Sequence, residues 1–243
     1  MHNSHLNGPA ENAEASVFTE KEKKAGARFA FAAVGVGKEK KRRLYLFLKR
    51  LFDVIASFSG LIILFPLFIA VIAAIRLESE GKAIYRQTRL GKNGKPFTFY
   101  KFRSMANNSD ELLLRFTPKQ KADFEKNFKL DGDPRVTKFG AFLRRTSLDE
   151  LPQLLNILFG ELSVVGPRPI VECETYKYGE AVGKLLSVKP GLTGYWQVNG
   201  RNGTTYEQRV EMDMFYIDNR SLLLDAKIFF KTFKAVFTGK GAR

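Results

Sequence analysis

The chain has 243 residues and a formal net charge of +15, which predicts polyanionic partners: nucleic acid, anionic lipid or phosphorylated substrates. Its one cysteine, Cys173, excludes an intramolecular disulfide. The two histidines, His2 and His5, lie in the polar residues 1–37, which we predict to be a disordered tail. A histidine-activated nucleophile and a histidine-bound zinc are therefore excluded from the rest of the chain.

A long apolar segment without charge covers residues 54–75, enough as a helix to cross a bilayer core. Lys and Arg residues flank it on both sides, and basic flanks favour the cytoplasmic side of a membrane. Pro66 lies near its middle, where proline removes a backbone hydrogen bond and bends a helix. We predict a helix over residues 44–75 that enters the membrane, bends at Pro66 and returns. A spanning helix with a tolerated proline is the alternative.

A β-hairpin is predicted after the membrane segment. Residues 83–88 and 97–102 have the composition of strands, and the Asn-Gly pair at 93–94 is typical of a tight hairpin turn. Lys101 and Arg103 follow along the second strand, with an apolar residue between them. They either face a phosphate site or form the outer face of the strand.

Two helices are predicted from capping residues and periodicity. Thr117, followed by Pro118 and Gln120, is typical of a capped helix start, and we expect this helix to run to about residue 129. Residues 222–237 are amphipathic, with lysines on one face and apolar side chains on another. The second helix either lies in the membrane interface or packs on the domain core.

Two adjacent carboxylates, Asp149 and Glu150, follow the basic pair that ends at Arg145, and we predict that a helix starts near them. A structural role is one interpretation, because Ser147 and Glu150 have capping-box spacing and Asp149 is a good N-cap. A functional role is the other, because a helix start favours ionised carboxylates and attracts phosphate. Two carboxylates suit Mg²⁺ completed by substrate phosphates, and an ionised Asp attacks phosphorus without a general base.

Two further segments carry candidate binding residues. Arg168 stands between Pro167 and Pro169, so it should project from a rigid turn. Its guanidinium group suits bidentate phosphate binding, and a solvated surface turn is the alternative. Residues 189–203 are rich in glycine around Trp196 and predict a loop whose aromatic and amide side chains suit a nucleobase or ribose.

Taken together, these segments resemble the bacterial sugar transferase family, the monotopic phosphoglycosyl transferases. The resemblance extends from about residue 49 to residue 237. It rests on six motifs in order, at residues 49–53, 100–105, 147–153, 166–169, 190–202 and 224–228. Relatives in this family often have serine before the helix-breaking proline, whereas this chain has Phe65.

The resemblance implies transfer of a sugar-1-phosphate from a UDP-sugar to a membrane polyprenyl phosphate, with release of UMP, to initiate bacterial surface polysaccharide or exopolysaccharide synthesis. It implies that Asp149 is the nucleophile, that Glu150 is its partner and that the pair binds Mg²⁺ as cofactor. We expect phosphate contacts from the cations Arg168, Lys101, Arg103 and Arg145. We expect nucleotide contacts from Gln197, Asn199 and Arg201.

The expected fold is α/β and membrane-associated, mostly helical with a small β-hairpin and a re-entrant helix bent at Pro66. We expect a tail at 1–37, a basic lead-in and membrane helix at 38–82, and a catalytic domain at 83–243. This domain should work at the cytoplasmic face of the bacterial inner membrane and contact anionic lipids. Nucleic acid is not an expected partner, and self-association is left open. A non-catalytic, membrane-tethered binder of polyanions is the competing hypothesis.

Overall fold

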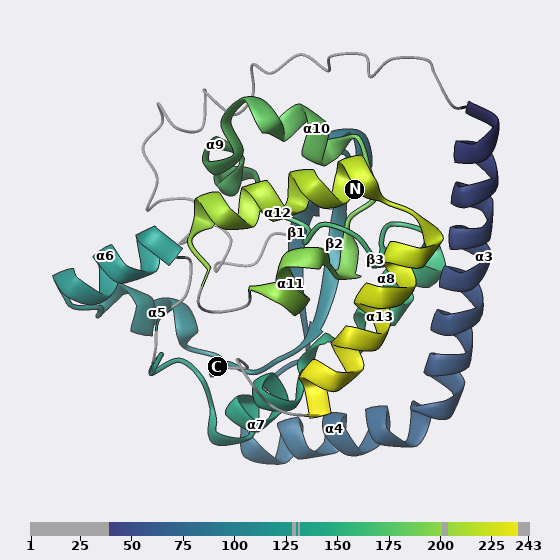
Figure 1. The fold of residues 1–243 in the computed structure, drawn as a ribbon. Helices are drawn as coiled ribbons and strands as arrows, with labels where there is room; N and C mark the ends of the chain where they lie inside the picture. The colour runs from purple at the N-terminus through teal and green to yellow at the C-terminus, as the bar shows by residue number, and fades with distance from the viewer. Residues whose placement is uncertain (1–38, 128–129, 131, 201–203, 238–243) are drawn as a thin grey trace, which may run out of the picture.

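The computed structural model describes residues 39–127, 130, 132–200 and 204–237, so the predicted tail at 1–37 lies outside the described residues. Two helices frame the molecule in Figure 1. Helix α3 (Glu39–Ile63) runs along its right-hand side, and α4 (Phe65–Glu78) continues along the bottom. The remaining helices and strands pack on the inner side of this frame.

A bend of 61° separates α3 from α4, which confirms the bend predicted near Pro66. Pro66 lies in the first turn of α4, where its missing amide interrupts hydrogen bonding to the preceding helix. No single described helix is long and apolar enough to cross a membrane, but the bent pair meets both criteria together. Its large exposed apolar side chains include Phe47, Phe58, Ile62, Ile63, Phe65 and Ile69.

Polar side chains attach α3 to the rest of the protein. Asp53 is 2% exposed and accepts a hydrogen bond from the Val164 amide at 2.8 Å. Arg50 donates to the Ile157 carbonyl at 2.6 Å, at the end of the helix that follows the acidic pair. The basic and acidic residues of the 49–53 motif therefore anchor α3 to the rest of the protein.

Helix α13 (Leu222–Phe237) contacts the same part of α3. Asp225 accepts hydrogen bonds from Lys49 Nζ at 2.7 Å, from the Tyr45 hydroxyl at 2.9 Å and from the Tyr216 hydroxyl at 2.8 Å. Ile228 is buried in the core, whereas Phe230 is 70% exposed. The predicted amphipathic helix is confirmed, and it packs on the core while presenting a second apolar face outward.

The predicted hairpin is present. Strand β1 (Ile84–Leu90) pairs antiparallel with β2 (Pro96–Phe102), and Asn93 and Gly94 both have positive φ in the turn between them. A second sheet was not predicted from the sequence. It joins β3 (Ser163–Val165) in parallel with β4 (Gly191–Thr193). Strand β4 lies within residues 189–203, where a loop was expected.

The described elements confirm a mostly helical fold with small sheets. Helix α6 (Pro118–Asn127) starts as predicted, with the Thr117 hydroxyl accepting from the Gln120 amide at 3.3 Å. The other short helices are α5 (Ser109–Leu114), α7 (Lys138–Thr146), α8 (Gln153–Phe159), α9 (Thr175–Tyr178), α10 (Val182–Leu186), α11 (Tyr195–Asn199) and the longer α12 (Tyr206–Asn219).

A small apolar cluster of Leu113, Phe116 and Phe124 packs α5 against α6. Two main apolar clusters hold the other elements together. The larger one joins the hairpin to α8, β3, α12 and α13, with Phe99, Ile157 and Tyr216 among its members. The smaller one packs α4 against β2 and α7, through Val71, Phe102 and other residues. Leu148 and Leu151, which flank the acidic pair, pack on the smaller cluster. The acidic pair therefore lies where the bent helices meet the domain.

Candidate active site

The acidic pair lies in a short 3₁₀ turn, η2 (Leu148–Glu150), between α7 and α8. The predicted helix start near residues 147–149 is wrong, because α8 begins at Gln153. Ser147 adopts a left-handed conformation with φ of 58° and makes no side-chain cap. Asp149 in this turn is buried, with only 7% of its surface exposed.

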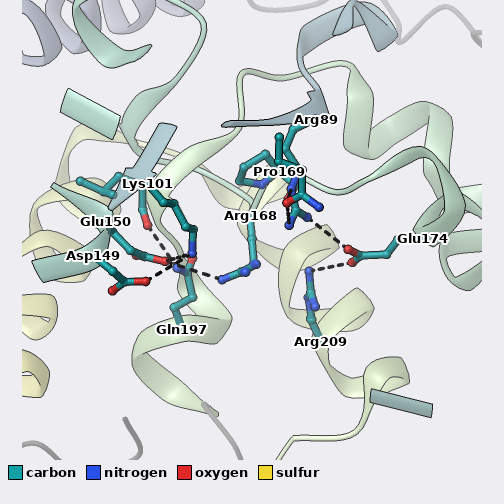
Figure 2. A network of polar contacts seen from close by, with 11 residues as sticks. Arg89, Lys101, Asp149, Glu150, Arg168, Pro169, Glu174, Gln197 and Arg209 are labelled. Atoms are coloured by element: carbon teal, nitrogen blue, oxygen red, sulfur yellow. Dashed lines mark hydrogen bonds and ion pairs between the residues drawn. The ribbon is translucent and has the colours of Figure 1, made fainter. Parts of the chain in front are cut away.

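Two cations from other elements converge on these carboxylates (Figure 2). Lys101 of β2 places its ammonium 3.0 Å from Glu150 Oε1 and 3.7 Å from Asp149 Oδ2. Arg168 Nη1 lies 4.0 Å from the same Glu150 oxygen. The fold thus brings together four predicted site residues that are separated by up to 67 positions in the sequence, since 168 − 101 = 67.

Burial controls the charge of the pair. Desolvation raises the pKa of Asp149, while Lys101 opposes this rise and Glu150 adds to it. Arg144 and Arg168 also favour the ionised form of Asp149. Arg144 is held by a 2.9 Å hydrogen bond from its Nε to the Ser104 hydroxyl. The site therefore holds a buried carboxylate whose ionised form depends on surrounding cations.

Close packing of two backbones fixes the turn that carries Arg168. Gly166 directly follows the last residue of β3, and its backbone lies against that of Gly191, the first residue of β4. A Cβ atom on Gly191 would lie 2.1 Å from the Gly166 nitrogen, so no side chain fits there. Arg89 Nη1 donates to the Pro169 carbonyl at 3.3 Å and holds the turn from the β1 side. The predicted rigid projection of Arg168 is therefore built by glycines as well as prolines.

A second polar cluster, centred on Glu174, adjoins this turn and was not predicted from the sequence. Glu174 is 6% exposed and pairs with Arg89 at 3.2 Å and with Arg209 at 3.7 Å. It also accepts a 2.9 Å hydrogen bond from the Tyr206 hydroxyl. These residues belong to β1, the segment before α9, and α12, so no local motif marks them. Arg89 lies in a strand of mixed polarity that also contains Arg86, so the sequence gives it no distinctive signal.

Two predicted phosphate-binding residues lie elsewhere. Arg103 donates to the Ser79 carbonyl at 2.7 Å and so covers the end of α4. Arg145 is exposed, with its guanidinium group 5.9 Å from the centre of the Phe142 ring. Neither contact involves the acidic pair. Arg144, the neighbour of Arg145, is the basic residue that faces the site.

The predicted nucleotide-binding residues are divided. Gln197 lies below the acidic pair in Figure 2 and donates to the Leu192 carbonyl at 3.2 Å. Asn199 instead accepts a 2.9 Å hydrogen bond from Lys231 of α13, on an exposed part of the surface. Arg201 lies outside the described residues. These three residues belong to α11 and the segment that follows it, where a loop was predicted.

The donor set of the acidic pair fits Mg²⁺. This ion takes one or two carboxylates and completes its shell with water and substrate phosphates. Asp149 and Glu150 are adjacent, and the Lys101 ammonium beside both shows that this point attracts a cation. Among the described residues no cluster of three or more His, Cys, Asp or Glu side chains could hold a metal.

Several known proteins are similar in sequence to this chain. A Salmonella typhimurium protein named undecaprenyl-phosphate galactose phosphotransferase is 49% identical over 199 residues, covering 81% of this chain and 42% of that protein. The exopolysaccharide production protein ExoY of Sinorhizobium fredii is 46% identical over 197 residues, covering 80% of this chain and 87% of that protein.

A Klebsiella pneumoniae protein named UDP-glucose:undecaprenyl-phosphate glucose-1-phosphate transferase is 43% identical over 203 residues, covering 80% of this chain and 41% of that protein. The chain thus spans about two fifths of the Salmonella and Klebsiella relatives. The family model described as bacterial sugar transferase matches residues 44–239. The chain belongs to the bacterial sugar transferase family.

Proposed function

We propose that this protein transfers a sugar-1-phosphate from a UDP-sugar to a polyprenyl phosphate, releases UMP and so begins the synthesis of a bacterial polysaccharide. The observation that carries the proposal is the buried Asp149, with Glu150 beside it and Lys101 and Arg168 directed at the pair. The names of the Salmonella and Klebsiella relatives support the two substrates.

In the first step, a carboxylate oxygen of Asp149 attacks the phosphorus next to the sugar. A new bond joins that oxygen to phosphorus, and the bond from phosphorus to the UMP oxygen breaks, so UMP leaves with the electron pair. In the second step, an oxygen of the polyprenyl phosphate attacks the same phosphorus and Asp149 leaves as a carboxylate. Both attacking groups are already anionic, so no general base is needed.

The surrounding residues supply position and charge. Lys101 favours the ionised form of Asp149, and Arg168 presents a planar guanidinium that suits phosphate oxygens. Asp149 and Glu150 would hold Mg²⁺, which when bound neutralises charge on the diphosphate of the substrate. Transfer between phosphate oxygens depends mainly on such positioning and neutralisation.

The bent helix pair supports a membrane role at the same site. We propose that α3 and α4 form a re-entrant hairpin in the cytoplasmic leaflet of the inner membrane, with basic residues on both flanks facing the cytoplasm. The apolar side chains exposed along both helices suit a lipid environment. Because Leu148 and Leu151 pack on the apolar cluster that α4 shares with β2 and α7, the acidic pair would lie near a phosphate that projects from the membrane surface.

A mass measurement tests this function. The purified protein, given candidate UDP-sugars one at a time without a polyprenyl phosphate, should release UMP and gain the mass of a sugar phosphate on Asp149. Undecaprenyl phosphate should then remove the adduct and restore the original mass. An adduct on another residue would overturn the role of Asp149. Absence of UMP release with every sugar, both lipid and Mg²⁺ being present, would overturn the function itself.

A further inference from the structure

The Glu174 cluster joins two distant parts of the chain through one buried carboxylate. Glu174 Oε1 accepts a hydrogen bond from Arg89 of β1, and its other oxygen faces both Arg209 and the Tyr206 hydroxyl of α12. A carboxylate with partners on both oxygens holds two guanidinium groups at fixed positions. Figure 2 shows Arg168 between this cluster and the acidic pair.

The two arginines are also fixed by contacts beyond Glu174. Arg89 donates to the Pro169 carbonyl, so it links Glu174 to the turn that carries Arg168. The Arg209 guanidinium lies 4.6 Å from the Trp196 ring centre and 4.9 Å from that of Tyr206. Rings on two sides restrict its orientation, as in cation–π packing. The geometry is thus set before any ligand arrives.

The cluster carries more positive charge than Glu174 neutralises. Arg89, Arg168 and Arg209 all act on Glu174, while the carboxylates of Glu150 and Asp213 lie near Arg168 and Arg209 respectively. Arg209 Nε and Nη2 are buried without a hydrogen-bond partner among the described residues. Buried guanidinium groups with donors to spare, next to a site for phosphoryl transfer, are suited to an anionic ligand with several oxygens.

We propose that Glu174 is a positioning residue that arranges Arg89, Arg168 and Arg209 into the surface that binds the diphosphate of the nucleotide substrate. This inference rests on the proposed function. Glu174 itself touches no substrate; it acts by holding two arginines and, through Arg89, the Arg168 turn.

The test is the binding of UDP to the full chain in detergent, measured by calorimetry. Glu174→Gln keeps the shape of the side chain and removes its charge. If Glu174 only offset positive charge, this change would tighten UDP binding, because one repelling charge is lost. If it positions the arginines, we expect binding to weaken about tenfold and KM for the UDP-sugar to rise with little change in kcat.

Two further variants keep the test decisive. Tyr206→Phe removes one hydrogen bond to Glu174 and leaves its charge, so we expect a smaller loss, about threefold, in the same direction. Asp218→Asn is the matched control, since Asp218 is an exposed carboxylate of α12 that pairs with Lys184 at 2.6 Å. This variant should bind UDP like the unaltered chain.

Unchanged or tighter binding by Glu174→Gln, in a chain that still releases UMP, would overturn the positioning role and leave the proposed function intact. If Glu174→Gln does not fold, unchanged binding by Tyr206→Phe overturns the positioning role instead. Failure of the unaltered chain to bind UDP would overturn both proposals.

Discussion

The ammonium group of Lys101 lies 3.0 Å from Glu150 Oε1. The same nitrogen is 3.7 Å from Asp149 Oδ2, so one cation of the hairpin is shared by two carboxylates of η2. A cation at this distance favours the ionised form of a carboxyl group. Lys101 of strand β2 therefore opposes the rise in the pKa of Asp149 that burial causes.

The pH dependence of the reaction should report this contact. Burial raises the pKa of Asp149 and Lys101 lowers it, so Lys101→Gln should move the acidic limb of kcat/KM to higher pH. Because the two carboxylates interact, the apparent pKa of this acidic limb is a property of the pair and not of Asp149 alone. Initial rates of UMP release between pH 5 and 9 would measure it, with the exposed Lys184→Gln as control. A limb at the same pH in both variants would contradict the coupling.

Asp149→Asn should separate activity from stability. Loss of the attacking oxygen should lower transfer by about 10³-fold or more. Because the pKa of Asp149 is raised in the folded protein, its ionised form costs stability as the pH rises through that pKa. The asparagine variant should therefore melt about 2 °C higher near neutral pH, measured in detergent. A lower Tm together with full activity would exclude both roles.

Magnesium removal tests the proposed metal ligands. A chelator should abolish UMP release, and added Mg²⁺ should restore it. Glu150→Gln should raise the Mg²⁺ concentration for half-maximal activity about tenfold, because one charged ligand is lost. Glu180→Gln, on an exposed residue, is the control. Full turnover in the presence of chelator would show that the pair acts without a metal.

The re-entrant hairpin can be tested by labelling in intact cells. In a Cys173→Ser background, single cysteines replace Arg42 or Lys92, which are exposed on either side of the bent pair. Both cysteines should be protected from an impermeant maleimide outside the cell and react after permeabilisation. Reaction of just one of them in intact cells would establish a spanning pair.

The anchor at Asp225 should be worth far more than a surface ion pair. Asp225→Ala leaves Lys49, Tyr45 and Tyr216 without their shared acceptor, and we expect a loss of about 3 kcal/mol of unfolding free energy. The exposed Asp218→Ala should cost less than about 1 kcal/mol. Denaturation in detergent micelles would compare them, and equal losses would refute the anchor.

Local chemistry made part of this structure predictable. The Asn-Gly pair at 93–94 requires positive φ that few residues adopt, and Thr117 caps its own helix, so both elements appear as expected. The left-handed Ser147 has no such signal, and the helix start was therefore misplaced. Strand β4 exists only through its pairing with β3, which periodicity within residues 189–203 cannot reveal.

The candidate site also contains some residues that the sequence predicts and others that it does not. Asp149, Glu150 and Arg168 belong to short motifs whose residue types predict a chemical role. Glu174 and Arg209 belong to none, because their partners come from other elements and only the folded chain assembles them. Arg103 and Arg145 resembled site residues only through charge and neighbourhood, and the structure directs them to the end of α4 and to an exposed aromatic ring.

The hydrogen bond between Lys49 and Asp225 joins residues that are 176 positions apart in the chain. During synthesis, Lys49 is therefore made long before its partner. At roughly 5–20 residues per second, a ribosome needs roughly 9–35 s to make the segment between them. During that interval Lys49 of α3 must be satisfied by water or by lipid headgroups. The contact between α3 and α13 therefore forms only after nearly all of the domain between them has been synthesised.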